Sequence, residues 1–457
     1  MIGGFNMNGS VSAINSEVEI IIQKLVRKLS NPELVEFEFE RKNLQPWNPL
    51  SLSHGYPGLI ILFSEMDRYY PDKNFDNVAH QYMIKLRDLL ETADIQGNVS
   101  LFNGFSGINY TVLLASKEGT RYSSMLNTLD DHLYKLANSF MEQVEKKHED
   151  LPFGSFEFCY DLVMGITGIG RYALESRHPG MKKLLERILT HLVHLATEKL
   201  VEGEKVTNFF SPPETIIVEE DKLRFTSGYM NLGLSHGIAG PLALLSLAIT
   251  KGIVVKGQSQ AIDILFQTLH RMASKDGYGY YFKRMLGLED ILNGVSCNKE
   301  EDGRFDAWCY GSFGIARALS LAYEALEREE MKEMTSELLY SLVTVPVEKM
   351  NVKSSILCHG YGGNMQILNR LSHSKVIQED CKLRNLLEKR KTELLKVLIN
   401  QFDSKSEYGF YDVIYQNNSF KREEKIGFLE GVAGVLLSLV SCIKSQEARW
   451  DEILLLG

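Results

Sequence analysis

The sequence predicts an all-α protein, an α/α toroid (a double α-barrel) in which seven helical hairpins close into a ring with a small β-rich insertion. Two observations lead to this prediction. A G-x-x-G frame followed by an apolar run occurs seven times along the 457 residues, which indicates a repeat architecture. The segments between these runs have the apolar spacing of amphipathic helices. The glycine pairs are Gly55/Gly58, Gly104/Gly107, Gly165/Gly168, Gly237/Gly240, Gly311/Gly314, Gly360/Gly363 and Gly431/Gly434.

The expected elements alternate along the chain, starting with an amphipathic helix over 14–29 that Asn31 and Pro32 end. Runs with few charges, typical of helices buried on every side, follow the glycine pairs at 59–63, 108–114, 241–249, 315–326 and 435–443. The amphipathic segments between them are 78–90, 122–144, 181–200, 261–272, 330–343 and 383–402. A linear α-solenoid is the alternative. It would leave the apolar helices exposed along one side, whereas a ring with the amphipathic helices outside buries them.

Three of the intervals between glycine pairs are longer than the others, and their extra residues have β-like or irregular character. They fall at 205–228, 276–306 and 408–425. We interpret them as excursions from a single toroid domain that spans 1–457, with a β-rich excursion at 203–230. We expect the excursions to pack together as a small lobe.

Composition and charge restrict the class of protein. The chain is 44% hydrophobic and 24% charged, which is ordinary for a soluble globular protein. Its net charge of −9 comes without a basic block, so no nucleic-acid partner is expected. The start of the chain lacks the features of a secretory signal, and no apolar run approaches the roughly 20 residues that cross a bilayer. We expect a cytosolic protein whose cysteines are thiols or metal ligands.

Two cysteines occupy the same place in neighbouring repeats, two residues before the first glycine of the pair. These are Cys309 in the fifth repeat and Cys358 in the sixth, which is followed by His359. Adjacent hairpins would bring the two thiols together. Two thiolates and an imidazole suit Zn²⁺ and leave one tetrahedral position open, as in catalytic sites. The alternative is that the cysteines are small buried hydrophobes. The other four are interpreted as structural: Cys159, Cys297, Cys381 and Cys442.

Further polar residues are expected around the same rim. His236 takes the equivalent place in the fourth repeat and can act as a general acid or base, or simply hydrogen-bond its loop. Asp161 can orient His236 or cap a helix. Tyr310 can hydrogen-bond a substrate oxygen or pack as an ordinary aromatic residue. His54 and Glu430 lie farther round the rim, as structural or substrate-lining residues.

The expected ligand set favours thiol chemistry. Two thiolate ligands make zinc a poorer Lewis acid for water but suit it to a thiolate that must stay nucleophilic. A cysteine, whose pKa is ordinarily near 8.5, loses its proton on binding zinc at neutral pH. A nearby acid can then protonate the carbanion or enolate that the attack generates. The residues therefore predict thiol alkylation.

At these residues the chain resembles the lanthionine synthetase C family, the cyclases of lanthipeptide (lantibiotic) biosynthesis. The resemblance implies a seven-hairpin toroid with one zinc ion per chain, bound by Cys309, Cys358 and His359. It also implies a small β-rich insertion. The stretches that carry the resemblance are 53–58, 234–240, 307–311 and 358–360.

The resemblance also suggests roles for neighbouring residues. His236 and Asp161 take the place of the family's catalytic acid/base pair, and Tyr310 that of a residue beside the metal. Family members often carry an arginine four residues before the first zinc cysteine. This chain has Phe305 there, with Arg304 one place earlier, so whether Arg304 reaches the cavity is a question for the structure.

By the same resemblance, the substrate is a precursor peptide, leader plus core, whose Ser and Thr residues have been dehydrated to dehydroalanine and dehydrobutyrine. A peptide cysteine adds to the alkene, and His236, or water near it, protonates the enolate to complete a thioether ring. The chain resembles the stand-alone class I cyclases, which work beside a separate dehydratase and a membrane exporter. This implies a cytosolic protein that such partners can recruit to the inner face of the membrane.

Two other functions are compatible with the residues. One is intermolecular thiol transfer, in which glutathione or a protein cysteine is joined to an electrophile or a prenyl group. The other is a non-catalytic peptide-binding scaffold with a structural zinc. Cyclisation leaves the mass of a dehydrated peptide unchanged but removes a free thiol, whereas intermolecular addition raises the mass and a scaffold changes neither.

Overall fold

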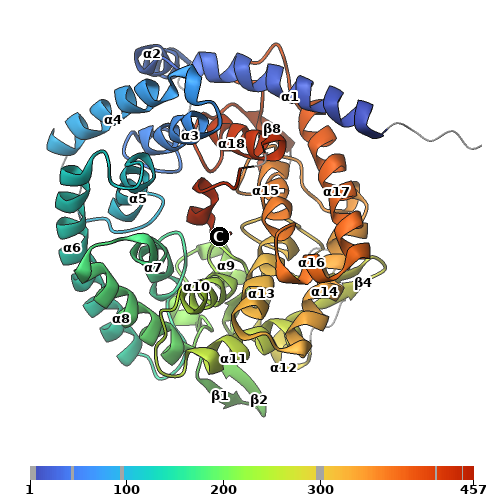
Figure 1. Ribbon diagram of the computed structural model, residues 1–457. Coiled ribbons are helices and arrows are strands. Elements are labelled where there is room, and N and C mark those ends of the chain that lie inside the picture. The colour runs from blue at the N-terminus through green and yellow to red at the C-terminus, as the bar shows by residue number, and fades with distance from the viewer. Residues whose placement is uncertain (1–6, 43–45, 93–96, 295–302, 417–418, 445) are drawn as a thin grey trace, which may run out of the picture.

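Two concentric layers of helices form a closed ring (Figure 1). The computed structural model describes residues 7–42, 46–92, 97–294, 303–416, 419–444 and 446–457. The inner helices are α3 (Tyr56–Tyr69), α5 (Phe105–Ala115), α7 (Ile166–Glu175), α10 (Ala239–Thr250), α13 (Ser312–Leu326), α15 (Tyr361–Leu371) and α18 (Val432–Ile443). The outer helices are α1 (Met7–Leu29), α4 (Phe75–Thr92), α6 (Ser123–Glu149), α8 (Pro179–Leu195), α11 (Gln258–Met272), α14 (Glu329–Thr344) and α17 (Cys381–Asn400).

The ring closes between the two ends of the chain. The last inner helix, α18, packs against the first, α3, and the N-terminal α1 packs on the outside of α18 as the outer partner of the seventh hairpin. The predicted all-α toroid is therefore confirmed, and the linear solenoid is excluded. None of the helices within the described residues has the length and apolar character that crossing a bilayer requires.

Burial follows the two layers. In α10, all ten residues from Ala239 to Ala248 are buried, because neighbours surround an inner helix on every side. The outer α4 instead buries only one stripe, which consists of Ala79, Tyr82, Met83 and Leu86. This stripe has the spacing of a helix with one apolar face. The apolar periodicity of the sequence thus assigned inner and outer helices correctly.

The glycine pairs lie where the backbones of neighbouring repeats approach most closely. The residue three places before each first glycine is apolar and almost fully buried, and the second glycine packs against this layer. A Cβ atom on Gly58 would lie 2.7 Å from the Cβ of Phe428, and one on Gly363 would overlap the carbonyl oxygen of Leu357. The second glycine therefore leaves no room for a side chain. The layer consists of Leu52, Leu101, Leu162, Leu234, Trp308, Leu357 and Phe428.

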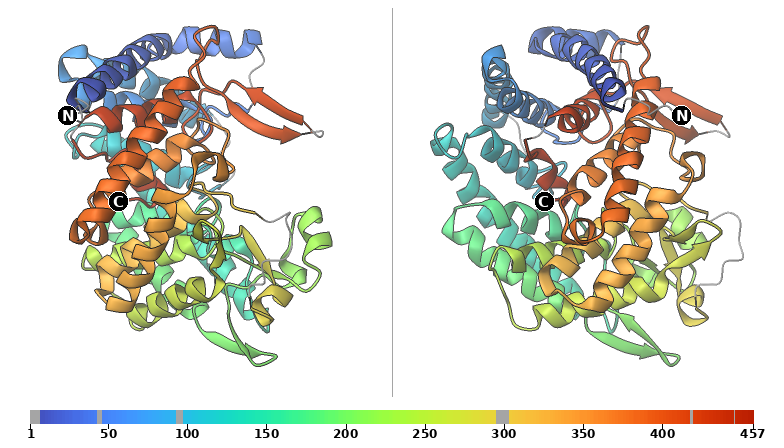
Figure 2. Two further views of the ribbon diagram at one scale, coloured as in Figure 1. Left: turned by 90° about the vertical axis from the view of Figure 1, so that its right-hand side faces the viewer. Right: turned by 45° about the vertical axis from the view of Figure 1, so that its right-hand side comes forward.

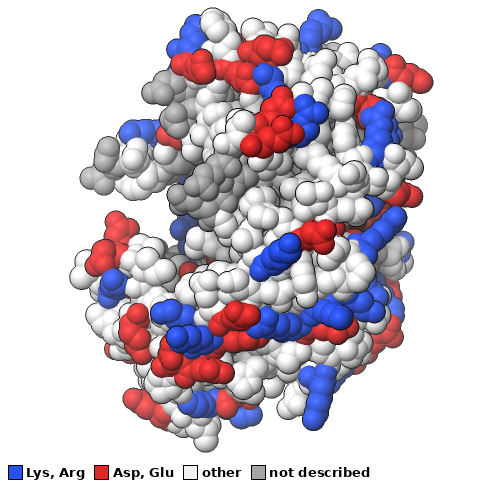
Figure 3. Space-filling model, turned by 90° about the vertical axis from the view of Figure 1, so that its left-hand side faces the viewer, with Lys and Arg blue, Asp and Glu red and all other residues white. Residues whose placement is uncertain are grey.

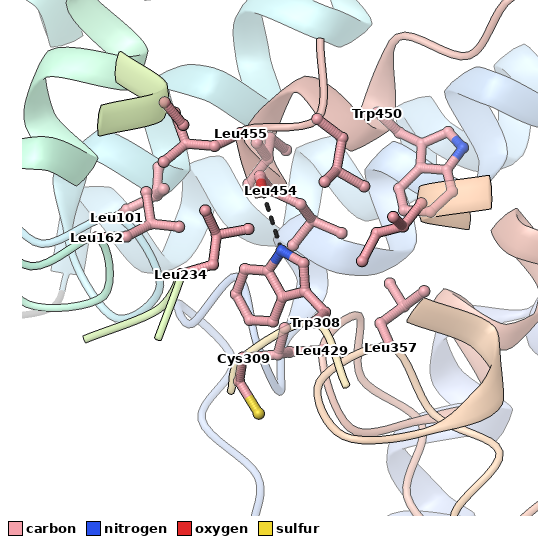
Figure 4. Close-up of a cluster of buried hydrophobic side chains, with 14 of the residues drawn as sticks. Leu101, Leu162, Leu234, Trp308, Cys309, Leu357, Leu429, Trp450, Leu454 and Leu455 are labelled. Atoms are coloured by element: carbon pink, nitrogen blue, oxygen red, sulfur yellow. Dashed lines mark hydrogen bonds between the residues drawn. The ribbon is translucent and has the colours of Figure 1, made fainter. Parts of the chain in front are cut away.

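The C-terminal residues fill the centre of the ring (Figure 1). The 3₁₀ helix η6 (Trp450–Leu454) leads into this plug, and residues 454–456 have no exposed surface. The indole nitrogen of Trp308 donates to the carbonyl oxygen of Leu454 at 3.0 Å (Figure 4). Since Cys309 directly follows Trp308 and turns its sulfur away from the apolar cluster, the plug supports the loop that carries this thiol.

Short elements connect the hairpins. The remaining helices are α2 (Pro32–Lys42), α9 (Glu219–Arg224), α12 (Leu288–Leu292), α16 (Lys375–Glu379), η1 (Pro71–Lys73), η2 (Glu157–Cys159), η3 (Pro213–Thr215) and η5 (Val347–Lys349). The antiparallel strand pairs are β1 (Glu198–Val201) with β2 (Glu204–Thr207), β3 (Tyr229–Asn231) with β6 (Met285–Gly287), β4 (Ser274–Asp276) with β5 (Gly279–Tyr281), and β7 (Asp412–Gln416) with β8 (Ser419–Glu423).

The strands leave the ring at the longer intervals (Figure 2). Pairing of β3 with β6 joins the first two excursions, whereas β7 and β8 form a separate hairpin. The outer helix expected over 181–200 ends at Leu195, and 198–201 form β1. Within 203–230 the structure has β2, η3, α9 and β3. The division into one domain with this excursion stays a prediction.

Candidate metal centre

A cavity of about 780 Å³ opens at the end of the ring where the glycine loops meet. This volume is in the usual range of ligand-binding sites. Every one of the seven loops contributes to its wall, so the loops lie together at one end of the toroid. One lining residue from each loop in chain order is Ser53, Asn103, Val163, Ser235, Cys309, Cys358 and Leu429.

Backbone hydrogen bonds join these loops around the cavity. The amide nitrogen of Ser235 donates to the carbonyl oxygen of Cys309 at 3.3 Å, and that of Cys309 to Cys358 at 3.1 Å. The series continues from Cys358 to Leu429 at 3.0 Å and from Leu429 to Ser53 at 3.4 Å. The position two residues before the glycine is therefore fixed to its neighbour in the next repeat. This pairing holds the two cysteines side by side although 48 residues separate them in the sequence.

The three predicted metal ligands lie together. One ligand atom each from Cys309, Cys358 and His359 is within 4.8 Å of the others, and among the described residues no other His, Cys, Asp or Glu joins this group. Nε2 of His359 is 2.9 Å from Oδ1 of Asp412, which leaves Nδ1 for a metal. Two sulfurs and one nitrogen with an open fourth position match the donor set of catalytic zinc.

The thiols favour different protonation states. The hydrogen bond from Cys358 to Cys309, together with burial, raises the pKa of the Cys358 thiol well above its ordinary value. Burial also opposes ionisation of Cys309, but that hydrogen bond and the nearby His359 outweigh it and lower the pKa of Cys309. A divalent cation would replace the shared proton of the pair and stabilise both thiolates.

His236 lines the same cavity and forms a hydrogen-bonded pair with the buried Asp161. Nδ1 of His236 is 2.6 Å from Oδ2 of Asp161, and the other oxygen of the carboxylate accepts from the backbone amide of Met164 at 2.8 Å. Asp161 has no exposed surface and is therefore held in place. Burial disfavours the imidazolium, but the hydrogen bond and charge of Asp161 outweigh it and raise the pKa of His236.

Tyr310 follows Cys309 in the chain and lies beside His236. Its ring is stacked on His236 with 6.3 Å between ring centroids, and it lines the cavity. Burial, followed by the charge of the neighbouring Cys309, raises the pKa of the Tyr310 phenol. The hydroxyl group is therefore protonated at neutral pH and can donate a hydrogen bond. The catalytic roles of His236, Asp161 and Tyr310 stay predictions.

An arginine absent from the predicted site lines the cavity. The guanidinium of Arg284 lies 4.0 Å from the ring centroid of Phe305 and 5.8 Å from that of Tyr310. Arg304, the residue considered from the sequence, instead forms ion pairs with Asp276 at 2.8 Å and Asp306 at 3.4 Å, and it is not part of the cavity wall. No motif marks Arg284, because it reaches the site only through the pairing of β3 with β6.

A buried charge network supports His359. Asp412 accepts from His359 through Oδ1 and from Nζ of Lys425 through Oδ2, at 2.9 and 2.8 Å. Burial opposes ionisation of Asp412, but these two partners hold its pKa well below the ordinary value. Lys425 also donates to Glu430 at 3.0 Å, and His54 lies 3.9 Å from Glu430. Hydrogen bonding of a ligand histidine to a carboxylate fixes its tautomer.

The remaining cysteines lie away from the cavity. Cys159 is buried, Cys442 is half-buried, and Cys381 is exposed at the start of α17, and none of these three lines the cavity wall. Burial raises the pKa of the Cys159 thiol to about 12, which makes it unreactive. Cys297 lies outside the described residues.

Comparisons with known proteins extend over nearly the whole chain. The chain is 23% identical over 410 residues to the nisin biosynthesis protein NisC of Lactococcus lactis subsp. lactis, with 88% of each chain covered. It shares its fold with the solved structure of nisin cyclase, at a TM-score of 0.71 and 22% identity, over 94% of this chain and 97% of that one. The family model described as lanthionine synthetase C-like protein matches residues 46–455, so the chain belongs to the lanthionine synthetase C-like family.

Proposed function

We propose that this protein is a zinc-dependent lanthipeptide cyclase. It would add cysteine thiols of a dehydrated precursor peptide to dehydroalanine or dehydrobutyrine and so form lanthionine and methyllanthionine rings. The observation that carries the proposal is the group of three ligand atoms, Cys309, Cys358 and His359, within 4.8 Å of one another in the wall of the shared cavity. Membership of the lanthionine synthetase C-like family supports it.

The metal site would determine the protonation state of the substrate thiol. Zinc, when bound, lowers the pKa of a coordinated cysteine so that it is a thiolate at neutral pH. Cys309 and Cys358 keep the site electron-rich, which preserves the nucleophilicity of that sulfur. Asp412 holds His359 through Nε2 and so presents Nδ1. The open side of the site faces the cavity, where the peptide would enter.

The neighbouring loop, next to the three ligands, supplies the proton. A carbon–sulfur bond forms at the β-carbon of the dehydro residue while the alkene electrons move to the carbonyl, giving an enolate. His236, protonated through its contact with Asp161, donates a proton to the α-carbon. The phenol of Tyr310 and the guanidinium of Arg284 can stabilise the charge on the enolate oxygen. The substrate thiol supplies the proton that recharges His236, so the product is an isomer of the substrate.

The proposal extends to the setting of the enzyme. The substrate is a precursor peptide of leader plus core, modified beforehand by a separate dehydratase and exported afterwards by a membrane transporter. The cyclase itself would be one toroid domain over 1–457 with its β-rich excursion at 203–230. It would act in the cytosol and be recruited to the membrane by these partners.

Metal content and ring formation test the proposal together. Purified wild type should hold about one zinc per chain, and Cys309→Ala and Cys358→Ala should lose it, because two ligands remain. Mass spectrometry of a dehydrated peptide should show unchanged mass with loss of the alkylatable thiol for wild type, but not for either ligand variant. Cys442→Ala, in α18 away from the cavity, is the matched control. Unchanged zinc in both ligand variants would contradict the site, and a raised peptide mass would indicate intermolecular thiol transfer.

A further inference from the structure

The β7–β8 hairpin projects from the helical ring (Figure 2), and four of its residues line the cavity. Its strands pair antiparallel with Tyr415 opposite Phe420, and within the described residues neither strand pairs with a third. In profile, a notch opens on the side of the cavity mouth, and positive and negative side chains are interspersed on the face in view (Figure 3). The hairpin residues that line the cavity are Val413, Ile414, Tyr415 and Phe420.

The hairpin exposes an aromatic pair at the cavity wall. Tyr415 is 65% exposed and Phe420 is 57% exposed, with 5.1 Å between their ring centroids. The ammonium group of Lys353, another lining residue, lies 4.9 Å from the Phe420 ring. Exposed aromatic side chains that continue into a cavity are typical of binding surfaces, because their burial by a partner is favourable.

The backbone of the hairpin is also open to a partner. Only the start of β7 is anchored, where the amide of Val413 donates to Oγ of Ser354 at 2.8 Å. In the described part of the chain, residues 419–423 make no backbone hydrogen bond beyond the hairpin. A free strand edge can accept an extended peptide as an additional strand.

The hairpin is fixed to the candidate metal centre at its base. Asp412, the first residue of β7, is buried and bonds both His359 and Lys425. A peptide that lies along the hairpin and enters the cavity therefore passes the three ligand residues. Ile414 lies two residues along β7 from Asp412, at a Cα separation of about 7 Å. Tyr415 is the next residue of the strand.

We propose that the β7–β8 hairpin is the docking arm for the substrate peptide. Tyr415 and Phe420 contact an apolar side chain close to the reacting cysteine, and the peptide lies extended against the hairpin. The identity of the occupant rests on the proposed function, whereas the docking surface rests on the exposed aromatic pair, the open strand edge and their continuity with the cavity. The arm thereby favours cyclisation of cysteines that have an apolar neighbour.

Binding of labelled peptides to the zinc-loaded full chain tests this inference. The probes are a fluorescent ten-residue peptide with a leucine, a cysteine and a dehydroalanine, a version with aspartate for leucine, and a version with alanine for cysteine. The double variant Tyr415→Ser/Phe420→Ser should bind the leucine peptide about tenfold more weakly by anisotropy, with unchanged zinc content. This variant should also bind the leucine and aspartate peptides with equal affinity, whereas wild type should prefer the leucine peptide.

Two control variants distinguish loss of the aromatic pair from loss of folding as the cause of weaker binding. Leu200→Ser/Val254→Ser removes apolar side chains that are at least as exposed on average but lie outside the cavity, and this variant should bind like wild type. Tyr415→Phe/Phe420→Tyr keeps the aromatic pair and should retain affinity. Equal binding of the leucine peptide by wild type and the serine variant would overturn the inference, as would a wild type that binds none of the probes.

The cysteine-free peptide distinguishes this inference from the proposed function. It cannot bind zinc through sulfur or form a ring, so its weaker binding to the serine variant supports the arm even if no cyclisation occurs. Peptide binding without ring formation in wild type would reject the cyclase proposal alone. Ring formation with equal binding by both chains would reject the arm alone.

Discussion

At the scale of single residues, the proposed proton transfer depends on the arrangement of Asp161 and His236. Asp161 has no exposed surface, and it uses one oxygen for the backbone of Met164 and the other for His236. Replacing the carboxylate by an amide keeps a hydrogen-bond acceptor for Met164 but removes the charge that stabilises the imidazolium. The effect on folding should therefore be small compared with the effect on protonation.

Asp161→Asn should lower the pKa of His236 and slow ring formation by about 10²-fold or more. In the proposed mechanism His236 acts in its protonated form, so activity should fall as pH rises through the pKa of this residue. Because Asp161 raises that pKa in the wild type, the fall should move to lower pH in the variant. A pH–rate profile with zinc content measured in parallel checks this. An unshifted profile would contradict the acid role of His236.

Arg284 belongs to the same part of the wall, held over the Phe305 ring. Arg284→Gln should lower kcat about 10²-fold, because the positive guanidinium proposed to stabilise the enolate oxygen is lost, while zinc content and thermal stability stay unchanged. Arg304→Gln should instead destabilise the fold, because Asp276 and the buried Asp306 lose their partner. Steady-state kinetics and thermal unfolding distinguish the two. Equal kinetics for wild type and Arg284→Gln would remove Arg284 from the mechanism.

At the scale of elements, the glycine pairs determine how each inner helix begins. Gly363→Ala should destabilise the protein by about 2 kcal/mol or more, because the new Cβ overlaps the carbonyl oxygen of Leu357. The same loop carries Cys358, so zinc retention against a chelator should also weaken. Thermal unfolding checks the first effect. Gly277→Ala, where a Cβ meets nothing within 4 Å, is the control and should behave like wild type.

The same elements explain how much could be predicted from the sequence. The repeat predicts a ring, and a ring brings equivalent positions of adjacent repeats close together. The proximity of Cys309 and Cys358 could therefore be predicted from their shared position before the glycine. The apolar residue three places before each glycine repeats just as regularly and would have predicted the buried layer around Trp308.

Residues outside the repeat could not be placed in this way. Arg284 reaches the cavity because β3 pairs with β6 across more than fifty residues, and Asp412 because β7 begins beside His359. Both depend on tertiary contacts of irregular segments, whose register no local pattern specifies. The resemblance to the lanthionine synthetase C family was confirmed, yet the expected arginine position holds Phe305 in this chain, and Arg284 comes from a different element.

At the scale of the whole molecule, the two ends of the chain complete the ring that the repeats begin. Helix α1 covers α18, and the C-terminal plug occupies the centre, where Leu454 accepts the indole hydrogen bond of Trp308. The C-terminal plug thus supports the loop that carries Cys309, while α1 closes the outer layer of the ring. The cavity, its ligands and the helical ring therefore depend on one another for their stability.

The outer helices make the stability of the fold depend on pH, independently of catalysis. His191 in α8 is only 7% exposed, its Nε2 has no partner in the described structure, and its ring lies 5.5 Å from that of His148 in α6. Burial, followed by the nearby His148, lowers the pKa of His191 to about 4. Glu145 opposes this shift, whereas His194 and Arg187 add to it.

This depressed pKa predicts that acid destabilises the fold. In the unfolded chain His191 takes up a proton near pH 6.5, but in the folded protein only near pH 4. Stability should therefore be complete above about pH 6.5 and fall by about 3 kcal/mol as the pH drops towards 4. Denaturant unfolding at pH 7 and pH 4.5 should show a smaller difference for His191→Leu than for wild type. His270→Leu, at an exposed site on α11, should leave this difference in stability unchanged. If it reduces the difference as much as His191→Leu does, the acid sensitivity does not arise from His191 between α6 and α8.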